Sequence, residues 1–406
     1  MRNFLNNFFF RSKNLDQLSK KIKNISQQTP VSKIFETINN YSSNSEIRYV
    51  GGCIRKAINN ETIDDIDLAT NLNPIEVCEA LKKKEISYYE TGIGHGTITA
   101  EINKHKFEIT SLRKDISTDG RHAKVEFSND WYEDASRRDF TINSIYSDVE
   151  GNLYDPFDGK KDLQNGKVKF IGNPETRIQE DYIRILRYIR FFINYSKHSH
   201  SEKIKNIIKQ NINGIKKISS ERLLIEFKKI IQSPMFLKLF DDTFCLEIIC
   251  LIFPQFKNIE IFKNLNDFGR RKIKDVDYVF LISLMILDNS DNVDYFLFKF
   301  NISSYNKKRI LFLKEFNSKK INNIFVKKNL WKILYHNGKQ SLLDLLYFQS
   351  FRSKKINKKL VDLISFFKDK EVPIFPIKAK SLMDKYHIKE GKLLGIKLKK
   401  IEEKWI

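Results

Sequence analysis

The sequence predicts an α+β protein whose N-terminal half is α/β and whose C-terminal half is all-α. Short β-like runs recur from Ile47 to Val149, between turns rich in Gly, Asn and Asp. Beyond Pro174, apolar residues recur at positions i, i+3, i+4 and i+7, which is the spacing of amphipathic helices. Charge changes at about the same place, because residues 1–200 carry 30 basic and 28 acidic side chains whereas residues 201–406 carry 42 and 22.

The individual elements follow from these patterns. The α/β half has one helical stretch, Pro74–Lys84, among four expected strands: Ile47–Val50, Asp65–Ala69, Gly96–Ile102 and Phe107–Leu112. Helical spacing in the second half is clearest over Tyr182–Phe192, Arg222–Ile231, Tyr278–Leu287 and Leu342–Phe348.

Composition excludes several classes of protein. With 41% hydrophobic and 30% charged residues, the chain of 406 residues does not resemble a disordered, collagen-like or disulfide-scaffold protein. Its four cysteines form no framework, which favours a reducing compartment. No apolar window approaches the roughly 18 residues that a membrane span needs. We therefore expect a cytoplasmic protein that does not associate with a membrane and has no obligate protein partner.

The net charge of +22 is concentrated in the second half of the chain. Such an asymmetry is typical of proteins that bind a polyanion, because cationic side chains displace counterions from phosphates. The charge therefore favours a nucleic-acid partner. A lysine-rich solvated surface is the alternative, since the whole sequence is rich in Lys, Asn and Ile.

A glycine pair follows the first expected strand. Gly51 and Gly52 precede a helical run, so their backbone N–H groups could approach a phosphate without obstruction by a Cβ atom. Arg55, one helical turn later, could add a positive charge. A simple turn is the alternative interpretation of the two glycines.

Three acidic residues form a candidate metal site. Asp65 and Asp67 occupy alternate positions of an expected strand, so both carboxylates point to one face, where a shared cation would relieve their repulsion. Mg²⁺ prefers such oxygen ligands. Glu108 lies on the polar face of another expected strand and could complete the arrangement that holds two Mg²⁺ ions for nucleotidyl transfer. An exposed edge strand is the alternative.

Five motifs in order resemble those of class II CCA-adding tRNA nucleotidyltransferases, a family that also contains bacterial poly(A) polymerases. The resemblance is strong from Tyr49 to Phe192 and weaker through Ser219–Leu223 to the C-terminal segment. The motifs are Gly51-Gly52-x-x-Arg55, Asp65–Thr70, Arg137–Asn143, Tyr154–Gly159 with Asp162-Leu163, and Glu180-Asp181-x-x-Arg184-x-x-Arg187.

The resemblance implies a polymerase-β-like nucleotidyltransferase head with a mixed sheet, followed by all-α neck, body and tail domains. We expect the boundaries as follows: N-terminal extension 1–28, catalytic head 29–150, base-recognising neck 151–215, helical body 216–330 and tRNA-binding helical tail 331–406. It also implies a nucleotide site made of Gly51, Gly52, Arg55, Arg138, Asp181, Arg184 and Arg187, beside catalytic Asp65, Asp67 and Glu108, of which Asp65 and Asp67 hold the metal.

The Glu180–Arg187 motif has a physical interpretation of its own. If it lies on one helix, Asp181, Arg184 and Arg187 are successive i, i+3 neighbours and present one acceptor and two donors on a shared face. The family uses this group as a protein template for the incoming base. Asp181 can accept from the exocyclic amine shared by C and A, while Arg184 donates to the ring acceptor beside it, an arrangement that disfavours G and U. A structural salt-bridge ladder is the alternative.

Three further features are less specific. Asp139 is expected to cap a helix. Arg113–Val125 is polar and without apolar periodicity, which predicts either a disordered surface loop or a mobile active-site loop; the resemblance implies the second. Lys56 stands where the family usually has Asp. If that Asp holds local structure, Lys56 weakens it; if the position lies near the triphosphate, Lys56 adds a favourable charge.

The sequence therefore predicts an Mg²⁺-dependent enzyme that adds C, C and A to tRNA 3′ ends from CTP and ATP. A poly(A) polymerase shares every head motif and is the first alternative. An enzyme adding only A or only C,C, and a catalytically inactive tRNA-binding protein, are the others.

Overall fold

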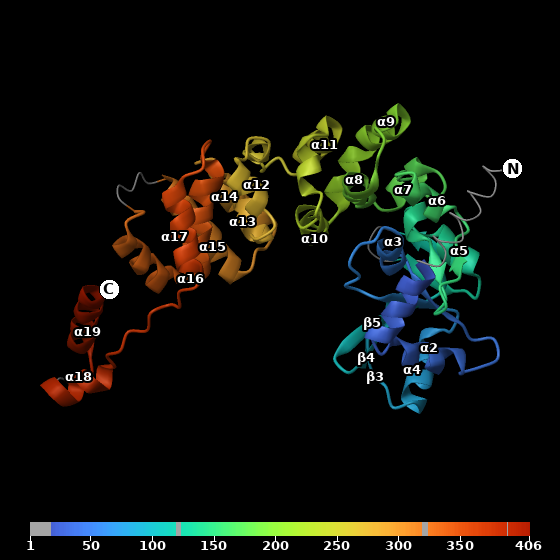
Figure 1. Cartoon of the computed structure of the whole chain (residues 1–406), viewed down its shortest axis with the longest axis horizontal. Helices are drawn as coiled ribbons and strands as arrows, with labels where there is room; N and C mark the ends of the chain where they lie inside the picture. The colour runs from blue at the N-terminus through green and yellow to red at the C-terminus, as the bar shows by residue number, and fades with distance from the viewer. Residues whose placement is uncertain (1–17, 119–122, 319–323, 388) are drawn as a thin grey trace. The chain divides into compact units, whose positions relative to one another are not determined.

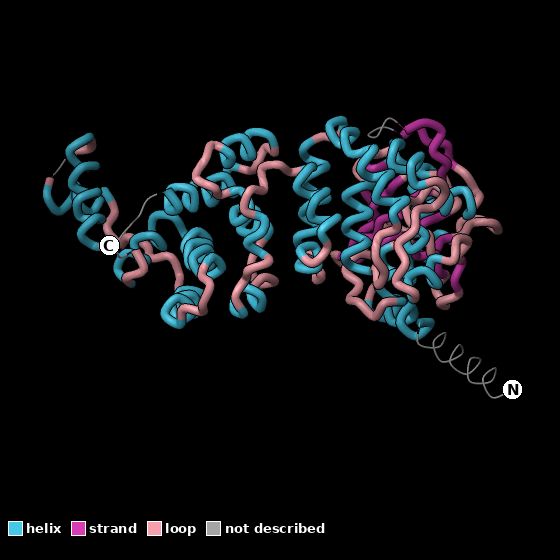
Figure 2. The backbone as a smooth tube through the Cα atoms, turned by 90° about the horizontal axis from the view of Figure 1, so that it is seen from above, coloured by secondary structure: helices cyan, strands magenta, loops and turns pink. Residues whose placement is uncertain are grey.

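The computed structural model of the chain describes residues 18–118, 123–318, 324–387 and 389–406. The chain divides into two compact units, the first ending at Glu226 and the second beginning at Phe227 (Figure 1). All strands of the described residues belong to the first unit, as the colouring of Figure 2 shows. The predicted fold class is therefore confirmed, while the bounds of the five expected domains stay a prediction.

Seven strands form one mixed sheet in the first unit, in the order β3-β4-β5-β2-β1-β8-β9. Strands β2 and β5 pair in parallel, and the other neighbours in this sheet are antiparallel. The strands are β1 Ile47–Val50, β2 Asp67–Thr70, β3 Ser87–Gly92, β4 Thr97–Ile102, β5 His105–Ser111, β8 Tyr146–Ser147 and β9 Leu153–Tyr154. The sequence analysis missed three strands of this sheet: β3, and the two-residue strands β8 and β9.

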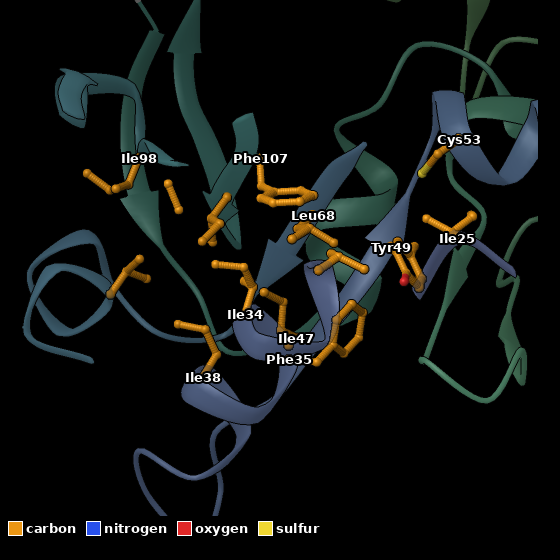
Figure 3. Close-up of a cluster of buried hydrophobic side chains, with 14 of the residues drawn as sticks. Ile25, Ile34, Phe35, Ile38, Ile47, Tyr49, Cys53, Leu68, Ile98 and Phe107 are labelled. Atoms are coloured by element: carbon orange, nitrogen blue, oxygen red, sulfur yellow. The ribbon is translucent and has the colours of Figure 1, made fainter. Parts of the chain in front are cut away.

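One face of this sheet packs on α2 (Val31–Asn39) and α4 (Pro74–Lys83). Figure 3 shows Ile34, Phe35 and Ile38 of α2 gathered with side chains of the sheet. Residues 18–28 are helical and bury Leu18, Ile22 and Ile25 in the same core, whereas residues 1–17 of the expected N-terminal extension lie outside the described residues. Helix α4 begins with a capping box between Asn73 and Glu76.

The expected loop Arg113–Val125 contains regular structure. Strands β6 (Arg113–Thr118) and β7 (Ala123–Phe127) pair antiparallel as a separate two-stranded sheet. Residues 119–122 lie outside the described part.

The remaining elements of the first unit are helices and 3₁₀ turns. Some of the helices lie between strands in the sequence and the others follow the last strand, and the final helix runs across the boundary between Glu226 and Phe227. These helices are α3 Gly52–Ile58, α5 Trp131–Ser136, α6 Gly159–Gln164, α7 Pro174–Glu180, α8 Arg184–Tyr195, α9 Glu202–Asn211 and α10 Ser220–Ile231, with 3₁₀ turns η1 Ile93–His95, η2 Thr141–Asn143 and η3 Ile212–Lys217.

The second unit is all-α, as expected. Its buried ionic centre is Arg309, which donates to Asp277 at 2.6 and 2.9 Å and to Asp344 at 2.7 and 3.0 Å, and so joins three helices. The helices are α11 Thr243–Ile252, α12 Asp267–Lys272, α13 Tyr278–Ile286, α14 Asn292–Lys299, α15 Ser304–Ser318, α16 Lys327–Arg352 (kinked at Gly338), α17 Lys358–Lys368, α18 Ala379–Tyr386 and α19 Lys392–Trp405. Among the described residues, none of the helices is long and apolar enough to cross a membrane.

Candidate active site

Three carboxylates meet where β2 begins. Asp67 is the first residue of β2 and lies directly opposite Glu108 of the parallel strand β5. The strand begins two residues later than expected, so Asp65 is not a strand residue but an exposed residue of the segment leading into β2. Partial removal from water raises the pKa of Glu108, and the negative charges of Asp67 and Asp65 raise it further. Glu108 therefore lies within electrostatic reach of both aspartates, and the three acids form one negatively charged cluster.

The glycine pair lies beside this cluster. Gly51 adopts a left-handed conformation with φ of 67°, which favours glycine, and its N–H donates to the Ile145 carbonyl at 3.1 Å. A Cβ atom on Gly52 would lie 3.7 Å from Oδ2 of Asp67, and one on Gly51 would lie 3.6 Å from a guanidinium nitrogen of Arg138. The turn therefore separates the acidic cluster from a cation.

Arg138 is held in place by buried partners. Its guanidinium donates to Oδ2 of Asp134 at 3.0 and 3.2 Å and to the Tyr146 hydroxyl at 3.0 Å. Burial alone would raise the pKa of Asp134, but Arg138 and Arg137 reverse this effect and hold it well below its usual range. The Arg138 nitrogen that faces Gly51 is thus a fixed positive charge at the rim of the turn.

Arg55 belongs to α3, and its side chain is buried against α8. It donates to Oδ1 of Asn143, and its guanidinium lies 4.9 Å from the ring centre of Phe191 and 5.2 Å from that of Tyr195. These contacts direct the side chain toward α8, so in this conformation Arg55 joins the sheet layer to the following helices.

A network of buried polar groups continues from Asn143. Its amide donates to Asp139 at 2.8 Å, and Asp139 also accepts from Arg187 of α8 at 2.6 and 2.5 Å. Arg187 approaches Glu226 at 4.0 Å. Burial would raise the pKa of Asp139, but Arg187 and Asn143 together lower it to about 2. The expectation that Asp139 caps a helix is wrong: its carboxylate accepts from the N–H of the next residue, Phe140, and the 3₁₀ turn that follows begins without a side-chain cap.

The Glu180–Arg187 motif does not lie on one helix. Helix α7 ends at Glu180, Asp181 has an extended backbone conformation, and α8 begins at Arg184. The expectation of a single helical face is therefore wrong for Asp181 and holds only for Arg184 and Arg187. Asp181 nevertheless remains adjacent to Arg184, whose N–H donates to the Asp181 carbonyl at 3.0 Å.

Both members of the predicted base-reading pair have protein partners. Asp181 forms an ion pair of 2.7 Å with Arg222 of α10, and Arg184 donates to Glu180 at 2.5 Å. Arg184 also donates to the Arg177 carbonyl at 2.6 Å. These contacts fix the orientation of both side chains. A carboxylate has about four acceptor sites and a guanidinium five N–H donors, so each group keeps capacity for a further ligand.

Sequence reasoning did not assign roles to four residues that position this site. Arg177 donates to the Arg138 carbonyl at 2.7 Å and to Glu180 at 2.6 Å, and so connects the segment of Arg138 to the end of α7. The others are Asn143, Arg222 and Glu226. Asn143 lies within one of the five motifs and Arg222 within the segment of weaker resemblance, whereas nothing in the local pattern marks Arg177 or Glu226.

Lys56 has a definite partner. Its ammonium lies 2.8 Å from Oδ2 of Asp64, the residue before Asp65. A lysine at this position therefore holds the segment that leads into β2, although the exposed Asp64 side chain limits the strength of the pair.

Two known protein families match parts of this chain. Residues 47–169 match the family described as the poly A polymerase head domain. Residues 201–259 match the family described as the probable RNA and SrmB-binding site of polymerase A.

Several proteins with sequences similar to this chain are named as CCA-adding enzymes. The mitochondrial CCA tRNA nucleotidyltransferase 1 of Homo sapiens is 46% identical over 191 residues, which cover 46% of this chain and 44% of that protein. A CCA-adding enzyme of Listeria monocytogenes is 32% identical over 62% of this chain and 63% of its own length. The chain thus matches about half the length of these relatives.

Solved structures extend the likeness of the fold over nearly the whole chain. The CCA-adding enzyme of Bacillus stearothermophilus, solved in complex with CTP, has a TM-score of 0.66 at 18% identity and covers 91% of this chain and 90% of its own. The Thermotoga maritima CCA-adding enzyme, solved with tRNA, has a TM-score of 0.60 at 19% identity, with 93% of this chain and 92% of that one covered.

Proposed function

We propose that this chain is a member of the family of class II CCA-adding tRNA nucleotidyltransferases and bacterial poly(A) polymerases, and that it adds C, C and A to the 3′ ends of tRNA from CTP and ATP. The observation that carries the proposal is the acidic cluster of Asp65, Asp67 and Glu108 beside the Gly51-Gly52 turn. This combination suits a triphosphate whose reacting phosphorus lies near the acids.

The acidic cluster suits a divalent cation. The charges of Asp65 and Asp67 raise the pKa of Glu108, and a shared cation would relieve this repulsion between the three carboxylates. Their oxygen donors are those that Mg²⁺ prefers. We assign Mg²⁺ to Asp65 and Asp67. When bound there, the ion would neutralise charge on the triphosphate and lower the pKa of the attacking hydroxyl.

The chain's own groups then have distinct roles. Glu108, whose pKa is raised, accepts the proton of the RNA 3′-hydroxyl. The 3′-oxygen forms its bond to the α-phosphorus, the bond to the bridging oxygen of the β-phosphate breaks, and pyrophosphate leaves. Gly51 leaves room for the phosphates, and Arg138 faces them with a charge that Asp134 holds in place.

Base selection falls to Asp181 and Arg184. An acceptor at Asp181 and a donor at Arg184 match the exocyclic amine and the neighbouring ring nitrogen that C and A share. Their ion pairs with Arg222 and Glu180 orient both groups before the nucleotide arrives, which reduces the entropy lost on binding. The cationic second half of the chain, with 42 basic against 22 acidic residues from position 201, supplies the contacts to the tRNA backbone.

One alternative has a specific observation in its favour. The head matches a family named for poly A polymerase, and the carboxylates and the glycine turn would serve either reaction. The two enzymes differ in when they stop. A CCA-adding enzyme ends after three nucleotides, whereas a poly(A) polymerase continues with A on many RNAs.

The test is incubation of the purified chain with tRNA that lacks its last three nucleotides. CTP and ATP are supplied separately and together, and the RNA ends are sequenced. We expect two C with CTP alone and C, C, A with both. An unstructured RNA serves as the control and should not be extended. Long A tracts on both RNAs would support the poly(A) polymerase instead, and no extension of either would support an inactive RNA-binding protein.

A further inference from the structure

A cavity of about 380 Å³ opens in the first unit, between residues 166–170 and helices α8 and α9. Its floor is apolar and largely aromatic. Phe170 and Tyr188 are buried and stack with their ring centres 5.8 Å apart. Phe192 is half-buried beside them and has one face stacked on His200, with the ring centres 3.5 Å apart, so its other face is the one that a ligand could meet. Ile204 and Ile207 of α9 close the other side. The polar atom of Tyr188 is satisfied, because its hydroxyl lies 2.9 Å from Nδ1 of the buried His200.

The rim of this cavity is cationic. Lys167, Lys169 and Lys203 are exposed and line it together with His198 and serines, and the described lining includes no carboxylate. Lys169 forms an ion pair of 2.8 Å with Asp162, which lies outside the lining. An aromatic floor beneath a positively charged rim fits a ligand that combines a flat ring with a negative charge.

We propose that this cavity binds one nucleotide of the RNA substrate, at a position other than the 3′ end, with the base on the aromatic floor and the phosphates on Lys167 and Lys203. The choice of RNA rests on the proposed function. Stacking of an unpaired base on aromatic side chains is the usual mode of RNA recognition, and the volume lies within the range of small-molecule sites. Lys203, Ile204 and Ile207 also fall within the segment that matches the RNA-binding family.

The cavity is distinct from the nucleotide site but shares a helix with it. On α8, Tyr188 and Phe192 line the cavity, whereas Arg187 contacts Asp139. The floor also reaches the segment that carries Arg138 and Asp139, since the rings of Phe170 and Phe140 are centred 4.6 Å apart and Phe140 adjoins Asp139. A nucleotide in the cavity would therefore stabilise the packing of α8 against the segment that carries Arg138 and Asp139.

The test is equilibrium binding of tRNA lacking its last three nucleotides to the full chain, in EDTA and without nucleoside triphosphates. Because no reaction occurs under these conditions, failure of the proposed catalysis cannot be mistaken for failure of the cavity. The variants are Phe192→Ala and the double variant Lys167→Ala/Lys203→Ala. Lys209→Ala, an exposed lysine of α9 outside the cavity lining, is the matched control.

We expect Phe192→Ala to weaken binding about fivefold to 150-fold, as for loss of one stacked base. The double lysine variant should weaken binding and reduce the log–log salt slope by about 0.7 for each phosphate that is no longer neutralised, with the Lys209→Ala variant close to wild type in both measurements. If Phe192→Ala lowers the melting temperature, the double lysine variant decides the question, because Lys167 and Lys203 are exposed and their removal should not disturb the fold. Wild-type tRNA affinity and salt slope in the double lysine variant would overturn the proposal. So would saturable binding of AMP that Phe192→Ala abolishes while tRNA affinity stays unchanged, because the cavity would then belong to a free nucleotide.

Discussion

The Asp139–Arg187 ion pair should make the stability of the first unit depend on pH in a predictable way. Asp139 is buried, and its pKa is lowered to about 2, against about 3.9 for an unfolded aspartate. A group whose pKa is lower in the folded state stabilises the fold above the unfolded pKa and loses this contribution as pH falls toward the folded pKa. The difference corresponds to about 2 to 3 kcal/mol at pH 7, which declines between about pH 5 and pH 2.

The measurement is urea unfolding of wild type and Asp139→Asn between pH 7 and pH 3. Trp131 is the tryptophan of the first unit, so a Trp331→Phe/Trp405→Phe background makes its fluorescence report on that unit. The free-energy difference between the two proteins should be constant near neutral pH. It should then narrow by roughly 1.4 kcal/mol for each pH unit below about 3.9.

The control is the same substitution in an Arg187→Met background, which removes the cation that donates to Asp139. In that background the free-energy difference should no longer narrow as pH falls, because the buried carboxylate has lost the main partner that lowers its pKa. A free-energy difference that stays constant from pH 7 to pH 3 in the wild-type background would refute the reasoning, because it would mean that the Asp139 carboxylate gains nothing from Arg187 in the folded state.

Three further predictions follow from other contacts. Asp181→Ala and Arg184→Ala should admit UTP or GTP in a four-nucleotide competition, with a loss of roughly 1–3 kcal/mol for the correct nucleotide, whereas a lowered melting temperature with unchanged selectivity would leave them only a bracing role. Binding of tRNA should weaken steeply with salt, with a log–log slope of about −0.7 to −0.9 for each neutralised phosphate, and a flat dependence would make the lysine-rich half an ordinary solvated surface. Arg309→Met should destabilise the second unit by about 3–5 kcal/mol in urea unfolding, because Asp344 stays buried without its partner, and a change below about 1 kcal/mol would contradict this.

The periodicity of apolar residues along the sequence correctly predicted several strands and helices. The strand Ile47–Val50 and the helix starting at Pro74 have clear alternation or capping signals, and the structure confirms both. The sequence analysis also expected Glu108 on a strand next to that of Asp67, and β2 and β5 are neighbours in the sheet with these two residues opposite each other. These inferences needed only neighbours in the sequence and the resemblance of the motifs.

Other features depend on distant contacts that no local pattern reveals. The break between Glu180 and Arg184 contains neither glycine nor proline, so the motif has the appearance of a continuous helix, yet Asp181 is extended and paired with Arg222 about forty positions later. Arg55 has the appearance of a surface cation near a phosphate site. Asn143 and the rings of α8 bury it, and these partners are far away in the sequence.

The most direct test of the catalytic assignment is single-turnover incorporation of CMP into tRNA that lacks its last three nucleotides, measured against Mg²⁺ concentration. Asp67→Asn is compared with Asp64→Asn, which removes an exposed carboxylate three positions earlier that pairs with Lys56. We expect Asp67→Asn to lower the rate by at least roughly 10²–10³-fold at every Mg²⁺ concentration while tRNA affinity stays near wild type, and Asp64→Asn to keep most of the activity. A wild-type rate and Mg²⁺ dependence in Asp67→Asn would contradict the assignment of the metal and of the reaction to this cluster.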